Sequence, residues 1–131
     1  MPAKVTPFLM FEGKAGEAMA FYVSLFPDAR IMNALHYGSG EAGPEGSVKQ
    51  ATFSIGGQAV RCTDSFVKHD FAFTPAFSFF VECGSEEELS RLFDNLSPGG
   101  MVFMPMGDYG FSRRFAWISD RFGVSWQLNL S

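Results

Sequence analysis

An internal repeat is the feature of this sequence that most restricts its fold. Breaker residues recur 71 positions apart, Gly13 with Gly84 and Pro27 with Pro98. Between the breakers of each half lies an apolar stripe with helical spacing. The stripes correspond position by position: Ala18, Tyr22 and Leu25 in the first half, and Leu89, Phe93 and Leu96 in the second. Tandem duplication of one supersecondary unit is the most economical account.

The repeated unit reads as a strand, a helix and three further strands. We expect the first unit at about residues 4–64, with strands 5–11, 30–37, 48–55 and 58–63 and a helix at 15–26. We expect the second at about residues 76–131, with strands 77–83, 101–106, 112–119 and 124–130 and a helix beginning after Ser85. Gly56-Gly57 predicts a hairpin turn. Pro7 predicts that its part of the first strand lies at a sheet edge or at a strand end.

The last strand alternates apolar and neutral polar residues. Val124, Trp126, Leu128 and Leu130 define one face and Ser125, Gln127 and Asn129 the other. A surface strand has the same period but usually carries Lys or Glu. Neutral hydrogen-bonding groups therefore predict that this face lines a cavity.

The repeat predicts a matching face in the first half. Aligning Gly57 with Gly123 pairs Arg61 with Gln127, so Ala59, Arg61 and Thr63 correspond to the polar trio. We expect these six residues to line the cavity. An arginine facing an apolar cavity requires an anionic partner. The alternatives are a solvent-exposed arginine or one paired to Asp64 or Glu82.

Aromatic residues supply a second candidate lining. Phe115 and Trp117 share one strand face, and Tyr109 lies on the preceding turn, so the three form either an apolar wall for a ligand or part of the core. Asp108-Tyr109 and Arg113-Arg114 lie in a turn that is either a lid or simply solvated.

Composition narrows the class of protein. At 131 residues the chain has the length of one domain, and its net charge of −4 with only one basic pair argues against a nucleic-acid partner. No stretch approaches the roughly 20 apolar residues of a membrane span, so we expect a cytoplasmic protein with no membrane partner. Cys62 and Cys83 are too few for a disulfide scaffold and are predicted to be reduced, buried thiols; a reactive Cys62 is the alternative.

The duplicated unit resembles the vicinal-oxygen-chelate, or glyoxalase/bleomycin-resistance, superfamily. Two end segments, Pro7 to Asp28 and Asp120 to Gln127, resemble more closely the PhnB-like family, labelled 3-demethylubiquinone 3-methyltransferase-like. The likeness implies an α+β fold in which tandem βαβββ modules curl a mixed sheet around a cavity, forming a single domain over residues 1–131. It also implies a homodimer, because many relatives complete their cavities between subunits. The loop at residues 64–75 departs from the family pattern.

Metal-dependent members take His, Gln or Glu ligands from the first and fourth strands of each half. Here Val5 to Phe11 and Pro75 to Val81 contain none of these residues, and the fourth-strand positions fall at Arg61 and Gln127. One neutral oxygen does not hold a divalent ion, and His36 and His69 are expected to be surface or hydrogen-bonded residues. We therefore predict no metal site. An unusual set drawn from Cys62, Asp64, His69 and Gln127 is the alternative.

The methyltransferase label finds no support in the motifs. Its cofactor commonly binds at a Gly-rich turn between a strand and a helix, whereas Gly38 to Gly43 is expected between two strands. We predict a metal-independent small-molecule-binding protein with no cofactor, whose ligand is small and anionic. The alternatives are a methyltransferase-like enzyme or isomerase acting on a quinone-like ring, a metal-dependent lyase or dioxygenase with a non-standard ligand set, and a protein that only sequesters its ligand. Acid-base catalysis would rest on Asp64, Glu82 or Asp108.

Overall fold

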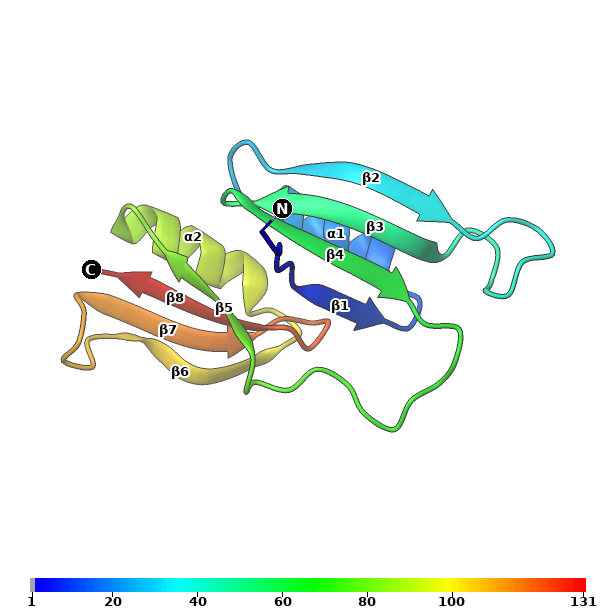
Figure 1. Cartoon of the computed structure of the whole chain (residues 1–131). Coiled ribbons are helices and arrows are strands. Elements are labelled where there is room, and N and C mark those ends of the chain that lie inside the picture. Colours follow the sequence, from blue (N-terminus) through cyan, green and yellow to red (C-terminus); the bar gives the residue numbers. More distant parts are fainter. Residues whose placement is uncertain (1) are drawn as a thin grey trace. The chain divides into compact units, whose positions relative to one another are not determined.

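Each half of the chain folds as a strand, a helix and three further strands, which confirms the predicted tandem βαβββ organisation. The computed structural model describes residues 2–131 and divides into two compact units with the boundary between His69 and Asp70 (Figure 1). The units are described separately below, as unit 1 and unit 2.

Unit 1 is a four-stranded sheet with one helix. Its elements are β1 (Phe8–Phe11), α1 (Ala15–Val23), β2 (Arg30–His36), β3 (Val48–Ile55) and β4 (Gln58–Asp64). The strand order is β1-β4-β3-β2, with β1 parallel to β4 and the other pairs antiparallel. β1, which begins directly after Pro7, therefore lies at the sheet edge, in agreement with the prediction from Pro7.

Unit 2 repeats this arrangement. Its elements are β5 (Ser78–Glu82), α2 (Glu86–Leu96), β6 (Met101–Gly107), β7 (Arg114–Ser119) and β8 (Ser125–Leu130), and the sheet order is β5-β8-β7-β6. β5 is parallel to β8, and the other two pairs are antiparallel. β8 thus occupies in unit 2 the place that β4 occupies in unit 1.

Each helix covers one face of its own sheet. The core of each unit lies between that helix and that sheet. In unit 1, Tyr22 of α1 packs on Phe53 of β3, and both are fully buried with Val60 of β4. In unit 2, Leu92 of α2 and Trp126 of β8 are fully buried. The face of each sheet opposite its helix is called the open face below.

Two element ends differ from the predicted ones by three residues, and the other strand ends differ by no more than two. β1 begins at Phe8 because Pro7 has no N–H to donate, although its carbonyl still accepts the N–H of Arg61. α1 ends at Val23, three residues early: the N–H of Ser24 bonds the carbonyl of Phe21, and that of Leu25 bonds the carbonyl of Tyr22. These short-range bonds tighten the last turn ahead of Pro27.

Candidate functional site

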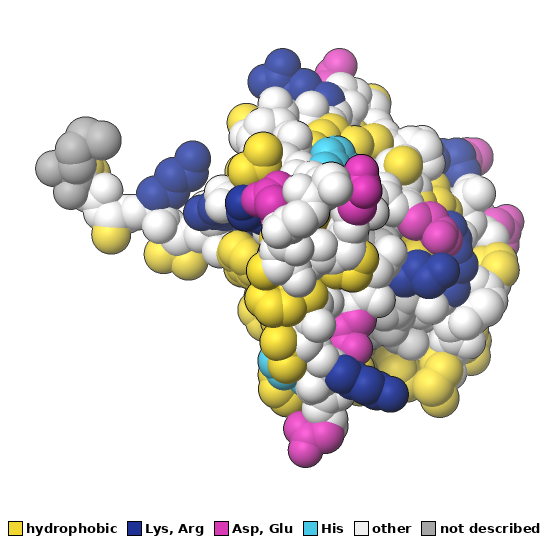
Figure 2. All heavy atoms as spheres, turned by 90° about the vertical axis from the view of Figure 1, so that its right-hand side faces the viewer, with side chains coloured by type: hydrophobic (Ala, Val, Ile, Leu, Met, Phe, Trp, Pro, Cys, Tyr) yellow, Lys and Arg dark blue, Asp and Glu magenta, His cyan; other side chains and the backbone are white. Residues whose placement is uncertain are grey.

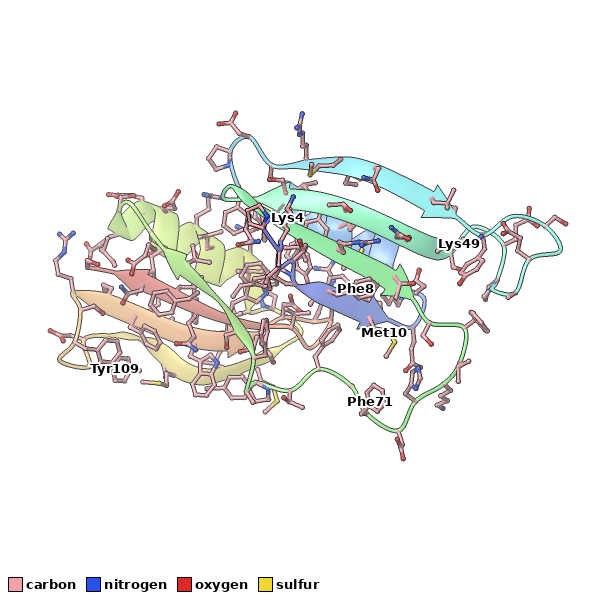
Figure 3. The ribbon with its side chains drawn as sticks, viewed as in Figure 1. Lys4, Phe8, Met10, Lys49, Phe71 and Tyr109 are labelled. Carbon is pink, nitrogen blue, oxygen red and sulfur yellow. The ribbon has the colours of Figure 1, made fainter. Side chains whose placement is uncertain are left out.

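Arg61 lies on the open face of unit 1. In β4, Val60, Cys62 and Asp64 are buried and the alternate residues Arg61 and Thr63 are half-buried, as the predicted period of two requires. Edge strand β1 brings Phe8 beside Arg61 and Met10 beside Thr63. Figure 3 shows the Phe8 and Met10 side chains extending from β1. The sequence prediction that Arg61 and Thr63 share a face is therefore met by the strand register.

The Arg61 guanidinium lacks an anionic partner within the described residues 2–131. Its central carbon lies 5.7 Å from the centre of the Phe8 ring. Its Nε is buried and makes no hydrogen bond, and no described carboxylate lies within 4.0 Å of the side chain. A buried N–H of a charged group without an acceptor is costly. Arg61 is thus a cation held ready for an acceptor that the described chain does not supply.

Asp64, one of the two partners considered for Arg61, has another role. It lies on the helix-facing side of β4 and is buried. Its Oδ1 accepts the N–H groups of Gly13 and Ala15 at 2.8 and 2.9 Å, and its Oδ2 accepts that of Val48 at 2.9 Å. The carboxylate therefore joins the start of α1 to β3, and its oxygens are occupied by structural hydrogen bonds.

Thr63 contributes less than its position suggested. Its hydroxyl donates to the carbonyl of Lys49 at 2.8 Å, so the group bridges β4 and β3. The Thr63 methyl group and the Met10 side chain are uncharged. The positive charge on this face of β4 is therefore that of Arg61.

The open face of unit 2 carries the polar trio predicted for the last strand. Ser125, Gln127 and Asn129 pair in register with Ser119, Trp117 and Phe115 of β7 and with Ser78, Phe80 and Glu82 of β5. The trio therefore shares its face with Phe115 and Trp117, the two aromatic residues that the sequence placed on one strand face. Five of the eight predicted lining residues come together here.

Ser125 is already committed to internal hydrogen bonds. Its buried Oγ accepts the indole N–H of Trp117 at 2.9 Å and forms a hydrogen bond with Ser78 Oγ at 2.6 Å, in which either hydroxyl can donate. This network fixes the Trp117 ring against β8. Ser125 is therefore better described as a residue that orients Trp117 than as one that binds a ligand.

Asn129 and Glu82 form the polar corner of this face. The amide Nδ2 of Asn129 donates to both carboxylate oxygens of Glu82, at 3.1 and 3.2 Å, and Ser131 Oγ donates to Glu82 Oε2 at 3.2 Å. Asn129 is 6% exposed, and its Oδ1 is buried without a partner. Glu82, the second partner considered for Arg61, is thus engaged within unit 2.

Three rings pack together next to this corner. Phe115 meets Phe111 at 4.9 Å and Tyr109 at 6.2 Å between ring centres, both edge to face. The Tyr109 hydroxyl donates to the carbonyl of Pro105 at 2.6 Å, which anchors the turn drawn around the labelled Tyr109 in Figure 3. Phe115 is buried beneath the two exposed rings. The predicted wall of Tyr109, Phe115 and Trp117 therefore lies on one face of unit 2, with Phe111 as a member that the sequence did not single out.

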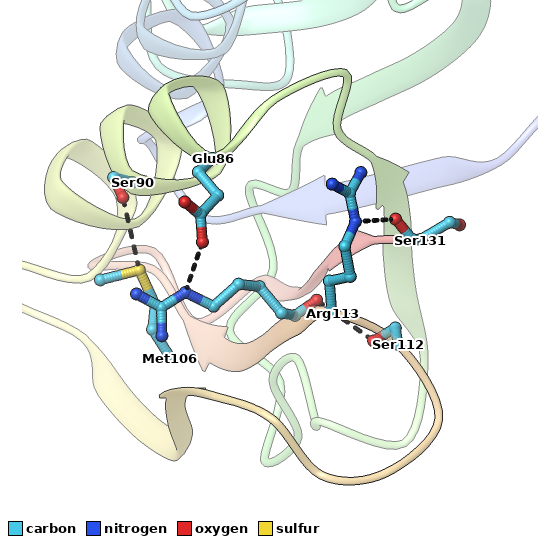
Figure 4. Close-up of polar contacts among 7 residues, drawn as sticks. Glu86, Ser90, Met106, Ser112, Arg113 and Ser131 are labelled. Atoms are coloured by element: carbon cyan, nitrogen blue, oxygen red, sulfur yellow. Dashed lines mark hydrogen bonds and ion pairs between the residues drawn. The ribbon is translucent and has the colours of Figure 1, made fainter.

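The basic pair of the same loop is fixed in place rather than free. Arg113 Nε donates to the Ser131 carbonyl, and Arg114 Nε lies 3.3 Å from Glu86 Oε1 at the start of α2 (Figure 4). Ser112 Oγ bonds the carbonyl of Arg114. These contacts give both arginines structural partners within unit 2.

Both cysteines are buried and free, as the sequence predicts. Burial raises the pKa of Cys62 to about 12, with a smaller contribution from the nearby Asp64 carboxylate. Burial also raises the pKa of Cys83 to about 11. A neutral thiol is a poor nucleophile and metal ligand, so the reactive Cys62 considered above has no support.

The His, Cys, Asp and Glu side chains of the described residues do not form a metal site. Within residues 2–131, no three His, Cys, Asp or Glu side chains converge. The alternative set of Cys62, Asp64, His69 and Gln127 has no support. The Cys62 thiol is neutral, the Asp64 oxygens accept backbone N–H groups, and His69 Nε2 lies 3.1 Å from Ser65 Oγ. Phe8 and Arg61 in unit 1 offer no oxygen, sulfur or neutral nitrogen ligand.

A small cavity in unit 1 was not predicted. It measures about 240 Å³ and is lined by Glu12, Gly13, Pro44, Ser47, Asp64, Ser65, Phe66, Val67 and Lys68. It lies where the loop after β4 passes the start of α1. The signal available in the sequence was the unusual stretch after Thr63, but its pairing with Pro44 and Ser47 depends on the fold.

The Gly-rich segment is a loop between strands, as predicted. It joins β2 to β3, and Glu41 Oε2 and Lys49 Nζ lie 2.7 Å apart across it. The hydrogen bond from Lys49 lowers the pKa of Glu41. No helix follows this glycine run, so the cofactor-binding turn of a methyltransferase has no counterpart at this position.

The sequence model of the family 3-demethylubiquinone-9 3-methyltransferase matches residues 3–129. The chain belongs to this PhnB-like family. A PhnB protein from Bacillus cereus is 50% identical, with a TM-score of 0.96 and coverage of 98% of this chain and 100% of that one. YjdN of Escherichia coli K12 is 24% identical over 96% of this chain and 94% of its own length.

More distant structures place this PhnB-like chain in the glyoxalase/bleomycin-resistance fold. The fosfomycin resistance protein FosX from Listeria monocytogenes has a TM-score of 0.66 at 13% identity and covers 100% of this chain and 94% of its own. At that identity the likeness shows the fold alone. A structure of a FosX variant contains Mn(II). The family and fold predicted from the sequence are confirmed.

Proposed function

We propose that this PhnB-like protein is a metal-independent small-molecule-binding protein and that Arg61 binds an anionic group of its ligand. The observation that carries the proposal is the buried, unpartnered Nε of Arg61, with no described carboxylate near it. A carboxylate, phosphate or phosphonate would accept from this N–H and from the rest of the guanidinium. The Phe8 ring beside Arg61 and the neighbouring Met10 and Thr63 supply an apolar border for the organic part of the ligand.

A thermal-shift panel of small carboxylates, phosphates and phosphonates tests this proposal. We expect at least one compound to raise the melting temperature of the wild type with saturation. Arg61→Met is expected to abolish the shift. Lys14→Met is the matched control, because it removes one positive charge of unit 1 from a residue paired with Glu17 on α1. Equal shifts in wild type and Arg61→Met would show that Arg61 is structural.

A homodimer belongs to the same proposal. Strand β2 lies at the edge of unit 1, and its Ile31, Met32 and Leu35 are 41, 49 and 58% exposed. Figure 2 shows hydrophobic side chains exposed on the molecular surface. Apolar groups on an unpaired edge favour association with a second copy. We likewise infer that the two modules act as one domain.

We place the protein in the cytoplasm on the basis of its buried, reduced thiols. Of the described residues 2–131, neither helix has the length and apolar character needed to cross a membrane.

A further inference from the structure

We propose that the open face of unit 2 carries a second subsite, which binds a protonated amine at Glu82. This goes beyond the anion site at Arg61, because it concerns another unit and a ligand group of opposite charge. It begins from one row of residues across the sheet. Glu82 of β5, Asn129 of β8, Phe115 of β7 and Gly107 of β6 are successive partners in register.

The Glu82 carboxylate of this row has no positively charged partner among the described residues. Glu82 is exposed, and within residues 2–131 no Lys or Arg nitrogen lies within 4.0 Å of its carboxylate. Arg113, whose backbone N–H donates to the Leu130 carbonyl beside this corner, directs its side-chain Nε to the Ser131 carbonyl instead. Asn129 and Ser131 donate three hydrogen bonds to the Glu82 carboxylate and hold it in place. An oriented carboxylate without a counter-ion is suited to an ammonium group.

The unpartnered oxygen of Asn129 is the second observation. Because Asn129 Nδ2 is used on Glu82, the amide orientation is fixed, and Oδ1 is left as a buried acceptor without a donor. Such an atom is rare in native structures and calls for a partner. A protonated amine carries two or three N–H donors, so it satisfies both Glu82 and Asn129 Oδ1 at once.

The aromatic end of the row completes the chemistry. Gly107 has no side chain, and a Cβ placed there would lie 3.6 Å from the Tyr109 ring, so the ring covers this end of the row closely. Tyr109 and Phe111 are 41 and 62% exposed, and both contact Phe115. Aromatic rings pack against the carbon skeleton that an ammonium group at Glu82 would carry along the row. The row thus favours an aralkyl or alkyl ammonium over a metal ion or a neutral alcohol.

Titration with benzylammonium tests this inference, with benzyl alcohol and benzoate as comparison probes. Binding is followed by calorimetry and by the NMR signals of the Asn129 side-chain amide. We expect saturable binding of benzylammonium and no matching response to benzyl alcohol. Glu82→Gln keeps the size of the side chain and an oxygen for Asn129, and it is expected to raise the Kd about tenfold or more.

Two further variants keep the test sharp. Glu87→Gln removes an equivalent exposed charge from α2 and is expected to leave the Kd within about twofold. Phe111→Ala removes an exposed ring and is expected to weaken binding about threefold. No binding of benzylammonium, or an unchanged Kd in Glu82→Gln, would overturn the inference. Arg61→Met is expected to weaken benzoate binding and to leave benzylammonium binding unchanged, so failure of the amine subsite is distinguishable from failure of the anion site.

Discussion

Arg61 and Asp64 show how one strand separates binding from structure. They are three positions apart in β4 and lie on opposite faces of the sheet. Arg61 has an unused buried donor, whereas Asp64 accepts three backbone N–H groups. A charged residue with all its partners inside the chain stabilises the fold, and one without them is available to a ligand.

Replacing Asp64 by Ala is expected to lower the free energy of unfolding by about 3 kcal/mol, since three buried N–H donors lose their acceptor. Chemical denaturation measures the change. Asp108→Ala is the control, because Asp108 accepts only the N–H of Gly110 in an exposed turn. A loss for Asp64→Ala as small as that of the control would contradict the assigned role.

The buried thiols make a pH prediction. The pKa of Cys62 rises to about 12 and that of Cys83 to about 11 on folding, from 9.0. Below pH 9 the thiols are neutral in both states, so they do not affect stability. Above pH 9 the unfolded state ionises first, and the free energy of unfolding falls as the pH rises toward 11–12.

Denaturation curves between pH 8 and pH 11 measure this fall, and Cys62→Ala is expected to make it shallower. A thiol reagent such as Ellman's reagent at pH 8 supplies the control. We expect slow reaction of the native protein and rapid reaction in denaturant. Rapid reaction of both thiols in the native state would disagree with their assigned burial.

Strand alternation was enough to place Arg61, Thr63 and the polar trio of β8 on their faces. It was not enough to find their partners. The pairing of Glu82 with Asn129 joins residues 47 positions apart through the parallel β5–β8 register, which no local pattern contains. The repeat also misled slightly: an offset of 71 aligns the two helix starts, whereas Phe8 and Phe80, which pair with Arg61 and Gln127, are 72 apart.

Among the secondary-structure elements, two glycines are expected to respond in opposite ways to replacement by alanine. A Cβ at Gly100, the residue before β6, would lie 1.9 Å from the Ser119 carbonyl oxygen of β7. Gly100→Ala is expected to cost about 3 kcal/mol of unfolding free energy, because backbone must move. Gly16 of α1 has only Val48 Cγ2 near, at 3.9 Å, so Gly16→Ala is expected to raise stability by about 0.5–1 kcal/mol. Thermal unfolding of both variants tests the contrast, which equal shifts of one sign would contradict.

Helix α2 begins directly after Ser85, as the sequence predicted, and Ser85 caps it. Ser85 Oγ accepts the N–H of Glu88 at 3.1 Å, although Glu88 Oε1 reaches back to the N–H of Gly84 rather than that of Ser85. Ser85→Ala is expected to lower stability by about 1 kcal/mol, and Ser85→Asp to restore most of it. Denaturant titration of the two variants is the measurement. No recovery in Ser85→Asp would argue against capping as the cause.

Helix ends and turns were predictable because capping residues, Gly and Pro act locally. The end of α1 was less so, because the apolar stripe continues to Phe26 while the hydrogen bonds already change character at Ser24. The apolar stripes indicated which side of each helix is buried. The strand orders within each unit were not predicted, because they depend on pairing between residues far apart in the sequence.

For the molecule as a whole, the exposed apolar residues of β2 support a dimer. Sedimentation velocity is expected to give twice the 14.4 kDa mass of one chain. A strictly monomeric protein at tens of micromolar concentration would contradict this part of the proposal.

Elemental analysis of protein purified without chelator is expected to find no stoichiometric metal, in keeping with the donor set of the open faces.

The most direct test of the account is the NMR signal of the Arg61 Nε–H, assigned by its loss in Arg61→Met. Titration with an anionic ligand found in the panel is expected to shift this signal with saturation, and at the same ligand concentration as the thermal stabilisation. That result would show the buried donor acquiring its missing acceptor. A signal that stays unchanged while the protein is stabilised by the ligand would show that the anion binds elsewhere and that the Arg61 face is not the site.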